Sequence, residues 1–591
     1  MTLPSIYALT SSQLTVTGVI SGNTPLVKSG NGTLVLAAAN TFGQAFNVTG
    51  GTAVVTGSLD PLTPTSLSSG TTLKGTGTMG VVNAMGGGTV SPGLSVGTLT
   101  TKGITFGATS TYAAEINGTY SYDTIVSQGP VAVGGTLSVS VPDGTDFEIP
   151  SFITLIQNDS AMPVSGTFSG LAEGATISSP NGYQFSVSYV GGDGNDVVLT
   201  RYSYIHYWTG AVSSAWSVPA NWQSNSPPVP GDSAQFGAGA VNLVATNDFP
   251  SGIHFYAVSI YSAGYTINLN NPSLDLVVAD FYNGTSTVTI GATLASDMSF
   301  TAYGAASNLV VNGTVTGNGT TVSVGGDGPM TFGATLNGSG GLAKYGNGTT
   351  ILTSNNGYTG PTSILAGALE IQSPQALGSP AAGTSVAAGA GLWVAGDLTL
   401  PEPLVLDGMG ASSTGALRFR LGTSVVTGPV NVANPVWIVT DGLTTGTLSG
   451  VVSGAGITKK GTGRLVLAGA NTFAGFFSAD GGIVQLAHPS ALGSTAVGTA
   501  VNPGTTLELS GGLAIGAEAL GITLSGFGGA GALHSVSGAN SWAGAIQLNG
   551  DASIGVSAGT LTLNGAVSGV YYLAKGGPGT LVLNANDNYT G

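Results

Sequence analysis

The sequence contains no cysteine and little charge. Only 11 of 591 residues are Lys or Arg and 26 are Asp or Glu, which gives a net charge of −15. Without cysteine the chain forms no disulfide, Fe–S cluster or thiolate zinc site. Eleven cations cannot build a phosphate-tracking surface, so we expect no nucleic-acid partner. No apolar run approaches the roughly 18 residues of a membrane span, so we expect no transmembrane segment.

Glycine and short apolar stretches are what the sequence has in abundance. Glycine accounts for 98 residues without a strict third-residue period, which excludes collagen, and the 42% of hydrophobic residues predict a buried core. Short runs of Val, Leu, Ile and Thr alternate with polar residues and end at Gly or Asn, as in 135–141 and 559–563. This pattern predicts an all-β chain with many turns.

Comparison of the chain with itself finds a repeat. Four segments align without gaps, each with the pattern Lys-x-Gly-x-Gly followed by a short strand. Each then continues into a polar turn and an aromatic residue. The repeat positions are Lys28, Asn40 and Phe42; Lys344, Asn356 and Tyr358; Lys459, Asn471 and Phe473; and Lys575 and Tyr589. The last three lysines lie 115 and 116 residues apart, which indicates a long repeat of about five smaller coils.

A coil of about 20–25 residues is the scale of one β-solenoid turn. Stacking such coils about 4.8 Å apart pairs the backbone groups and extends an apolar column along the axis. The corners need residues that tolerate positive φ, which accounts for Gly and Asn. We expect the inward column to include Leu34, Leu36, Ile351, Leu465, Leu467, Leu581 and Leu583.

These repeats resemble the autotransporter-associated β-strand repeat, also called the passenger-associated transport repeat. The resemblance is carried by the strands after Gly32, Gly463 and Gly579 and by the Asn-Thr-Phe and Tyr-Thr-Gly turns. It implies a right-handed parallel β-helix (β-solenoid) in large secreted or surface-displayed bacterial proteins. Residues 123–200 resemble a segment that closes such a module, and 207–236 one that opens it.

From this order we expect one body or two stacked solenoid modules. The expected divisions are a β-helix repeat segment over 1–104, a module-closing segment over 105–201, an aromatic-rich opening segment over 202–270 and a second β-helix over 271–591. Because the last repeat stops at Gly591, we expect a window of a longer tandem protein, or subunits that assemble end to end.

Residues 191–199 match a calcium-binding nonapeptide pattern. In the functional interpretation, Asp193 and Asp196 supply oxygen ligands to Ca²⁺. In the structural interpretation, the glycines form a hairpin or a corner, because stacked nonapeptides share ions and only one copy is present. We expect no other cofactor.

Trp208, Trp216 and Trp222 lie within 15 residues of one another. Their flat faces suit sugar rings, so one hypothesis is a platform for carbohydrate stacking. The other is a packed aromatic cluster that seals a solenoid end.

Charged side chains give little sign of catalysis. Arg418 and Arg420 point to one side of a strand with no matching acid nearby in the sequence. The repeated lysines are expected to cap strand corners and cover apolar surface with their stems. We therefore expect a non-enzymatic extracellular stalk, fibre-like or adhesin-like, that contacts itself, a polysaccharide or a host surface. The alternatives are a carbohydrate-active lyase or hydrolase and a carbohydrate-binding β-helix.

Overall fold

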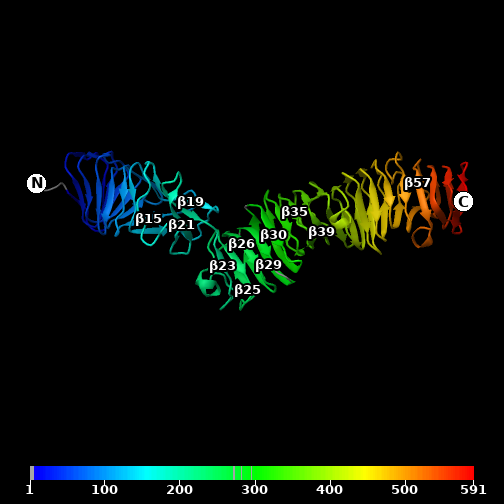
Figure 1. Cartoon of the computed structure of the whole chain (residues 1–591), viewed down its shortest axis with the longest axis horizontal. Coiled ribbons are helices and arrows are strands. Elements are labelled where there is room, and N and C mark those ends of the chain that lie inside the picture. The colour runs from blue at the N-terminus through cyan, green and yellow to red at the C-terminus, as the bar shows by residue number, and fades with distance from the viewer. Residues whose placement is uncertain (1–4, 271–272, 281–282, 295) are drawn as a thin grey trace. The chain divides into compact units, whose positions relative to one another are not determined.

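The computed structural model describes all residues except 1–4, 271–272, 281–282 and 295. They form a parallel β-solenoid of about 28 turns, drawn in Figure 1. The expected all-β parallel solenoid is confirmed, while its right-handedness stays an implication of the resemblance. Helical structure in the described ranges consists of short 3₁₀ turns: Pro219–Asn221, Gln223–Asn225, Ala411–Ser413 and Phe527–Gly529. No helix of the described residues is long and apolar enough to cross a bilayer.

The chain divides into two compact units. Unit 1 comprises Met1–His206, Ser226–Ala234 and Ile253–Tyr256, and unit 2 comprises Tyr207–Asn225, Gln235–Gly252 and Ala257–Gly591. The chain passes between the units within β23 (Ile205–Tyr207), β24 (Ser233–Phe236) and β26 (His254–Ile260).

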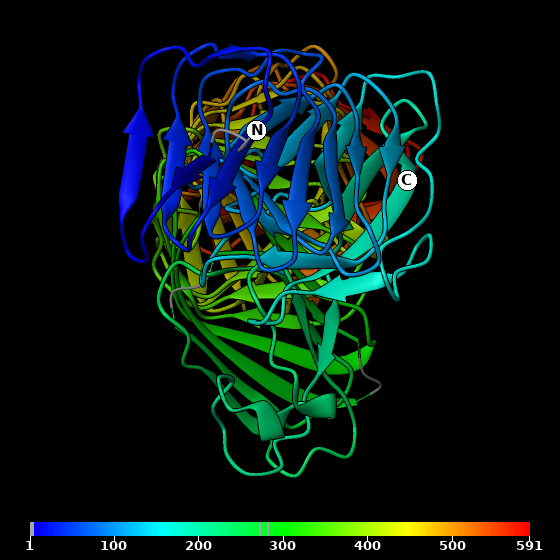
Figure 2. The same ribbon diagram turned by 90° about the vertical axis from the view of Figure 1, so that its left-hand side faces the viewer.

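Unit 1 contains two seven-stranded parallel sheets, whose blue and cyan arrows lie side by side in Figure 2. The first contains β1 (Ser5–Tyr7), β4 (Leu26–Ser29), β7 (Phe46–Val48), β9 (Thr65–Ser68), β11 (Val82–Gly86), β14 (Ile104–Thr105) and β17 (Val131–Ala132). The second contains β2 (Gln13–Val16), β5 (Thr33–Leu36), β8 (Thr52–Val55), β10 (Thr72–Gly75), β12 (Thr89–Pro92), β15 (Thr111–Glu115) and β18 (Thr136–Ser140). A short pair, β3 (Ser21–Gly22) and β6 (Thr41–Phe42), completes these coils.

The later part of unit 1 departs from the parallel pattern. A six-stranded sheet contains β13 (Thr98–Thr101), β16 (Thr124–Ser127), β19 (Ser151–Asn158), β20 (Thr176–Ser178), β21 (Gln184–Gly191) and β22 (Asp196–Arg201). In it β22 pairs antiparallel with both β19 and β21. β13, β16 and β19 still pair in parallel, so the departure lies in β20, β21 and β22, whose antiparallel pairs can be joined by short turns.

Unit 2 stacks its coils through three sheets. One includes β28 (Ser273–Ala279), β30 (Met298–Ala302), β32 (Val322–Gly325), β35 (Leu342–Tyr345), β38 (Thr362–Ile364), β40 (Thr384–Val386), β43 (Leu404–Leu406), β46 (Val430–Val432) and β49 (Val452–Gly454). A four-stranded sheet near the C-terminus contains β56 (Ala514–Ile515), β59 (Ala539–Trp542), β61 (Thr560–Leu563) and β64 (Thr580–Leu583).

The longest sheet has 27 strands. Its first half contains β25 (Val244–Asn247), β27 (Thr266–Asn270), β29 (Asn283–Leu294), β31 (Ala306–Gly317), β33 (Met330–Phe332), β34 (Thr335–Gly338), β36 (Thr349–Leu352), β37 (Gly357–Tyr358), β39 (Gly367–Ile371), β41 (Ala390–Ala395), β42 (Thr399–Leu400), β44 (Leu417–Leu421), β45 (Thr423–Val426) and β47 (Val436–Thr440). Its second half contains β48 (Thr445–Leu448), β50 (Ile457–Lys460), β51 (Arg464–Leu467), β52 (Phe477–Ala479), β53 (Gly482–Leu486), β54 (Thr499–Val501), β55 (Thr505–Ser510), β57 (Leu520–Leu524), β58 (Leu533–Ser537), β60 (Ile546–Val556), β62 (Val567–Gly569), β63 (Leu573–Gly576) and β65 (Asn588–Tyr589).

Alternation along each repeat strand fills the core. In β51, Leu465 and Leu467 are completely buried, whereas Arg464 and Val466 are partly exposed. In β5, Leu34 and Leu36 are buried in the same way. Each fully buried leucine stabilises the fold by about 1.5–3 kcal/mol relative to an exposed one.

The expected inward position of Ile351 is wrong. In β36 the side chains of Thr350 and Leu352 are buried, and Ile351 is half-exposed. The second strand residue after the corner glycine points inward, so Thr350 takes the place that Leu34 has in β5. Leu581 and Leu583 are half-buried, because β64 is the last strand of its sheet.

Close stacking explains the second glycine of the Lys-x-Gly-x-Gly pattern. A Cβ atom on Gly463 would lie 2.1 Å from the carbonyl oxygen of Asp441 in the preceding coil. At Gly32 the same atom would lie 2.1 Å from the carbonyl oxygen of Leu9. The first glycine has positive φ, +80° at Gly461, which an L side chain rarely adopts.

Candidate functional site

The repeat lysines form buried corners inside the coils. Lys28, Lys344 and Lys459 are completely buried. The Lys459 Nζ donates hydrogen bonds to the carbonyl oxygens of Gly461 (2.6 Å), Gly463 (2.8 Å) and Gly481 (2.6 Å). Three carbonyls thus match the three N–H donors of one ammonium group.

Two more repeats show the same lysine corner. The Nζ atoms of Lys28 and Lys344 each have three carbonyl acceptors: Ser29, Gly30 and Gly50 for Lys28, and Tyr345, Gly346 and Ala366 for Lys344. Lys575 lies in the last repeat, is exposed and donates to the carbonyl oxygen of Gly577. In each three-acceptor corner, one carbonyl lies 22 residues ahead, so the lysine joins successive coils.

Burial shifts the titration of these amines. Desolvation lowers the pKa of Lys459 to about 7 and that of Lys344 to about 8, and it also lowers the pKa of Lys28. The three acceptors oppose this effect, since a neutral amine has only two N–H groups. The expected role as a corner cap holds. The expectation of a stem lying over apolar surface is wrong for these three, because the charged head is inside the coil.

The repeat asparagines link neighbouring coils. The Asn471 Oδ1 accepts from the backbone N–H of Val452 (2.8 Å), and its Nδ2 donates to the carbonyl oxygen of Ala491 (2.6 Å). The same Oδ1 contact is made by Asn40 with Ile20, by Asn356 with Leu336 and by Asp587 with Val567. A polar corner thereby ties three successive turns together.

The repeat aromatics fill the core beside these amides. Phe42, Tyr358 and Phe473 are almost fully buried, at 3%, 2% and 0% exposure, and Tyr589 is half-buried. The Tyr358 hydroxyl lies 2.6 Å from the Thr362 Oγ1, and burial raises the pKa of Tyr358. The repeat signature is therefore a set of packing and corner residues.

Asp193 and Asp196 lie at the turn between β21 and β22. The Asp196 Oδ1 accepts from the backbone N–H of Asn158 (2.8 Å), and burial raises the pKa of Asp196. Asp193 lies at the exposed tip of the turn. Within the described residues, no group of three or more His, Asp or Glu side chains is placed to hold a metal ion.

The three tryptophans are brought together in unit 2. Trp208, Trp216 and Trp222 are 4%, 0% and 2% exposed. Trp222 makes edge-on contacts with Trp208 and Trp216, and Phe236 packs against all three. The stacking hypothesis needs exposed ring faces, and these rings are enclosed in the unit's core.

Unit 1 contains a buried ionic cluster at the end of β22. Arg201 at the end of β22 donates to the Asp232 Oδ1 (2.6 Å), and the His206 Nε2 lies 2.8 Å from the Asp232 Oδ2. Arg201 and Asp232 are 0% and 1% exposed. The Arg201 guanidinium also lies over the rings of Tyr183 and Tyr204. Arg201 and Asp232 are 31 residues apart, and no sequence pattern predicts that they pair.

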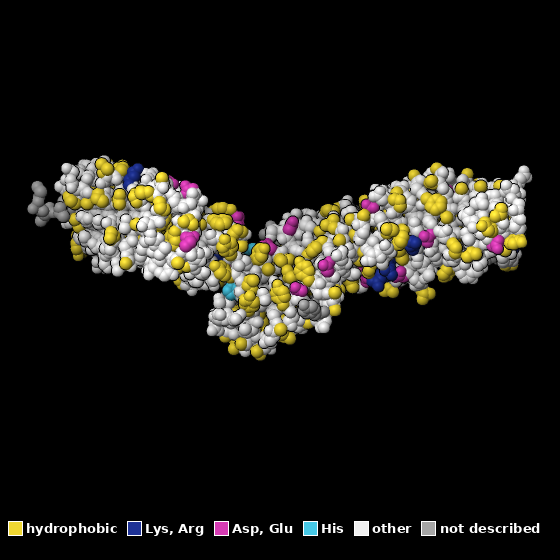
Figure 3. Space-filling model, viewed as in Figure 1, with side chains coloured by type: hydrophobic (Ala, Val, Ile, Leu, Met, Phe, Trp, Pro, Cys, Tyr) yellow, Lys and Arg dark blue, Asp and Glu magenta, His cyan; other side chains and the backbone are white. Residues whose placement is uncertain are grey.

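Unit 2 has a cluster of charged and aromatic side chains on its outer surface, where the dark-blue and magenta side chains gather in Figure 3. Arg418 lies 5.3 Å from the Trp393 ring centre and pairs with Asp441 at 3.0 Å. Arg420 lies 5.0 Å from the same ring and pairs with Glu370. The expectation of no matching acid is wrong, because neighbouring coils supply the carboxylates.

Further coils continue this charged surface. Lys460 lies 4.2 Å from the Trp437 ring centre and pairs with Asp480 at 3.2 Å, and Arg464 pairs with Glu508. Burial raises the pKa of Asp480, but hydrogen bonds, including that from Lys460, outweigh burial and lower it. The carboxylates of these pairs are already neutralised by a cation. The cluster is therefore suited to binding and packing rather than to proton transfer.

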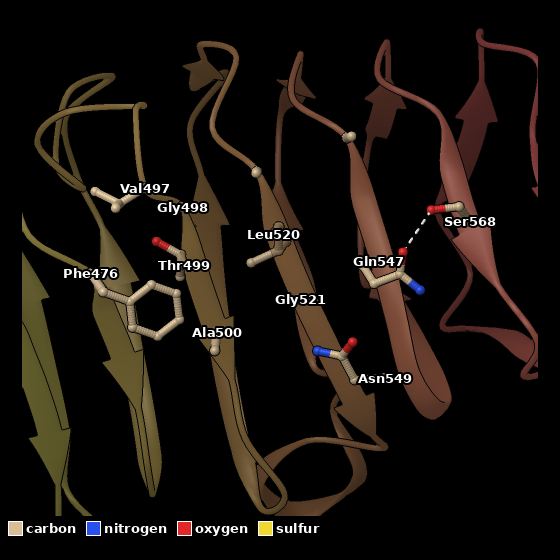
Figure 4. A pocket seen from close by; sticks show the side chains of 12 residues that line it. Phe476, Val497, Gly498, Thr499, Ala500, Leu520, Gly521, Gln547, Asn549 and Ser568 are labelled. Carbon is tan, nitrogen blue, oxygen red and sulfur yellow. Dashed lines mark hydrogen bonds between the residues drawn. The ribbon is translucent and has the colours of Figure 1, made fainter.

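A hollow of about 260 Å³ lies further along unit 2, across β54, β57 and β60. Figure 4 shows the Phe476 ring on one side and the amides of Gln547 and Asn549 on the other. Ala500 and Gly521 lie between them. Sequence reasoning did not find this hollow, because its residues come from five separate coils.

Comparison with known proteins places the repeats in a family. The passenger-associated-transport-repeat model matches residues 26–59, 342–371, 457–486 and 573–591. The chain therefore carries four such repeats, and each match contains one of the repeat lysines.

One curated relative is the adhesin BmaC autotransporter of Brucella suis biovar 1 (strain 1330). It is 28% identical over 517 residues, which cover 81% of this chain and 13% of the relative. The chain thus spans a small part of that protein's length. No solved structure matches the chain.

Proposed function

We propose that this chain is a structural, non-enzymatic part of a surface-displayed or secreted passenger β-helix that serves adhesion. The observation that carries the proposal is that three of the four passenger-associated transport repeats contain a buried lysine corner that joins successive solenoid coils. The similarity to a protein named as an adhesin autotransporter supports the adhesive role.

The physical character of the coils fits an extended display scaffold. Each coil pairs its backbone with the next, and the coil cores are lined by alternating apolar side chains. Charged residues are only 6% of the chain, and exposed strand positions such as Thr136, Ser138 and Ser140 of β18 carry hydroxyl groups. Such faces present hydroxyl groups without strong charge, which suits contact with a polysaccharide or a host surface.

The carbohydrate-active alternative needs a free acid and base on one outer sheet. Glu370 in β39 and Glu508 in β55 are largely buried, and each is paired with an arginine. We therefore favour binding over hydrolysis or lysis. Incubation of the purified chain with polysaccharides should release no reducing ends and no unsaturated products.

An adhesion assay tests the proposal. Beads coated with the purified chain should attach to host cells in a saturable way, and soluble chain should compete. The matched control is a bead coated with an unrelated β-solenoid of similar length. Attachment no greater than the control's on every cell type tested would contradict the adhesive role. End-to-end assembly stays a separate prediction, which light scattering of the purified chain would test.

A further inference from the structure

The hollow drawn in Figure 4 has a defined chemistry. Phe476 and Val497 are exposed at its rim, at 48% and 51% of their surface, although large apolar side chains are usually covered. Its floor is formed by Ala500 and Gly521, which are adjacent partners in the β54–β57 register. An exposed ring beside a flat floor leaves space for a planar ligand to lie against it.

The opposite side of the hollow carries amides. The Gln547 Oε1 accepts from the Ser568 Oγ (3.0 Å), and its Nε2 donates to the carbonyl oxygen of Leu548 (3.1 Å), so its orientation is set. Asn549 makes no side-chain hydrogen bond to any described residue, and its Nδ2 lies 2.6 Å from where a Gly521 Cβ would be. A free amide at this place offers both donors and an acceptor to a ligand.

The preceding long repeat shows what the hollow would be without its glycine. There the register aligns Ser385, Val405 and Asn431, which correspond to Ala500, Gly521 and Gln547. The exposed side chain of Val405 fills the place above the sheet, at 42% exposure. Phe476 corresponds to Pro361, so the aromatic rim is also particular to the later repeat.

No charged side chain lines the hollow. A carboxylate, sulfate or phosphate group would find no cation there, and an ammonium group no acid. A ligand matched to one aromatic face, two amides and a hydroxyl is uncharged, with an apolar face and several hydroxyl groups at its edge. A neutral pyranose unit has this character.

We propose that this hollow binds a neutral sugar unit of a glycan chain, with Phe476 as the stacking surface and Asn549 and Gln547 as hydrogen-bonding groups. The inference rests on the proposed adhesive function and names its ligand class. Gly521 leaves room for the Asn549 amide, whose Nδ2 lies 2.6 Å from where a Cβ would be.

The test measures binding of the full chain to immobilised oligosaccharides. The panel contains neutral gluco-, galacto- and manno-configured chains and the same chains with added carboxylates. Phe476→Ala should remove the stacking surface, and Gly521→Val should displace the Asn549 amide and place in the hollow the side chain that the preceding repeat has. Valine is tolerated there because Gly521 has ordinary φ and the nearest atom to a Cβ belongs to the flexible Asn549 amide.

The matched controls are Phe527→Ala, an exposed phenylalanine outside the hollow, and Asn431→Ala, the counterpart of Gln547. We expect at least one neutral chain to bind, with at least tenfold weaker binding in Phe476→Ala and Gly521→Val and no change in the controls. Thermal melting confirms that each variant is folded.

Three results would overturn the inference: no binding to any neutral chain, binding only to the carboxylated chains, or binding unaffected by both variants. If beads coated with folded Gly521→Val attach to cells as well as wild-type beads do, the sugar site fails while the adhesive function stands. If wild-type beads do not attach at all, the adhesive function fails first.

Discussion

The ammonium group of Lys459 donates to the carbonyl oxygen of Gly481, 22 residues further along the chain, over 2.6 Å. This bond joins a corner of one coil to the corner of the next, and Lys28 and Lys344 repeat it. In these three repeats the ammonium group supplies hydrogen-bond donors to buried corner carbonyls, which is where polar backbone groups most need them.

Replacing this lysine should destabilise the coil. Lys459→Met keeps the length of the side chain but removes the ammonium donor from three carbonyls, of which that of Gly463 also accepts from the Ile483 N–H, and this should cost about 2–4 kcal/mol in the free energy of unfolding. The neighbouring Lys460 is the control, since its partly exposed pair with Asp480 is worth only about 0–1 kcal/mol. Denaturant unfolding measures both variants. Equal losses for Lys459→Met and Lys460→Met would show that the buried corner has no special role.

The alternation of β51 predicts opposite outcomes for adjacent substitutions. Leu465→Asp puts an unpaired carboxylate into the core and should cost about 4 kcal/mol or more. Val466→Asp changes a side chain that faces outward and should cost less than about 1 kcal/mol. Thermal melting compares the two. A larger loss for Val466→Asp would mean that the strand register is shifted by one residue.

The stability of unit 1 should depend on the negative charge of Asp232 in its buried ionic cluster. Asp232→Asn removes the carboxylate that faces Arg201 and His206 and leaves the guanidinium buried without a counterion. The free energy of unfolding of unit 1 should fall by about 3–5 kcal/mol. Asp143→Asn is the control, since Asp143 lies in the same unit and accepts from Asn181 at an exposed position. An Asp232→Asn variant as stable as wild type would place the cluster outside the folding core.

The buried carboxyl group of Glu402 should make the stability of unit 2 depend on pH. Burial raises its pKa to about 7, although the hydrogen bond from Thr384 works against burial. Between its ordinary pKa of about 4.3 and 7, folded Glu402 keeps a proton that the unfolded chain has lost. Its stabilising contribution is therefore present at low pH and is lost as pH rises through 7. Glu402→Gln should flatten this slope between pH 5 and pH 7.5, measured by urea unfolding, and an unchanged slope would exclude Glu402 as its source.

The sequence predicted the solenoid because the repeat carries its own register. Glycine at the corner, the lysine before it and the alternating strand after it recur at fixed spacing, so stacking followed from Gly463 and Leu465 without further information. The error at Ile351 arose because Thr350 and Ile351 are both β-branched and composition alone does not choose between them. Whether a strand residue points inward is set by its distance in sequence from the corner glycine.

The sites were harder to predict, because their residues come from different coils. Arg418 pairs with Asp441 and Arg420 with Glu370, and these partners lie 23 and 50 residues away. The hollow at Gly521 depends on a missing side chain next to an exposed ring on another coil. One sequence shows neither the lateral alignment of coils nor which outward residues meet. The burial of the repeat lysines was missed for a different reason, since acceptors on the backbone leave no pattern in the side chains.

We propose that this chain is part of a passenger displayed at the cell surface, and its location on the cell tests this proposal. The most direct measurement is labelling of intact cells that make the protein, with an antibody raised against unit 2, before and after treatment with an external protease. We expect strong labelling of intact cells, which the protease removes. Labelling that appears only after the cells are broken open, and that external protease leaves unchanged, would contradict it.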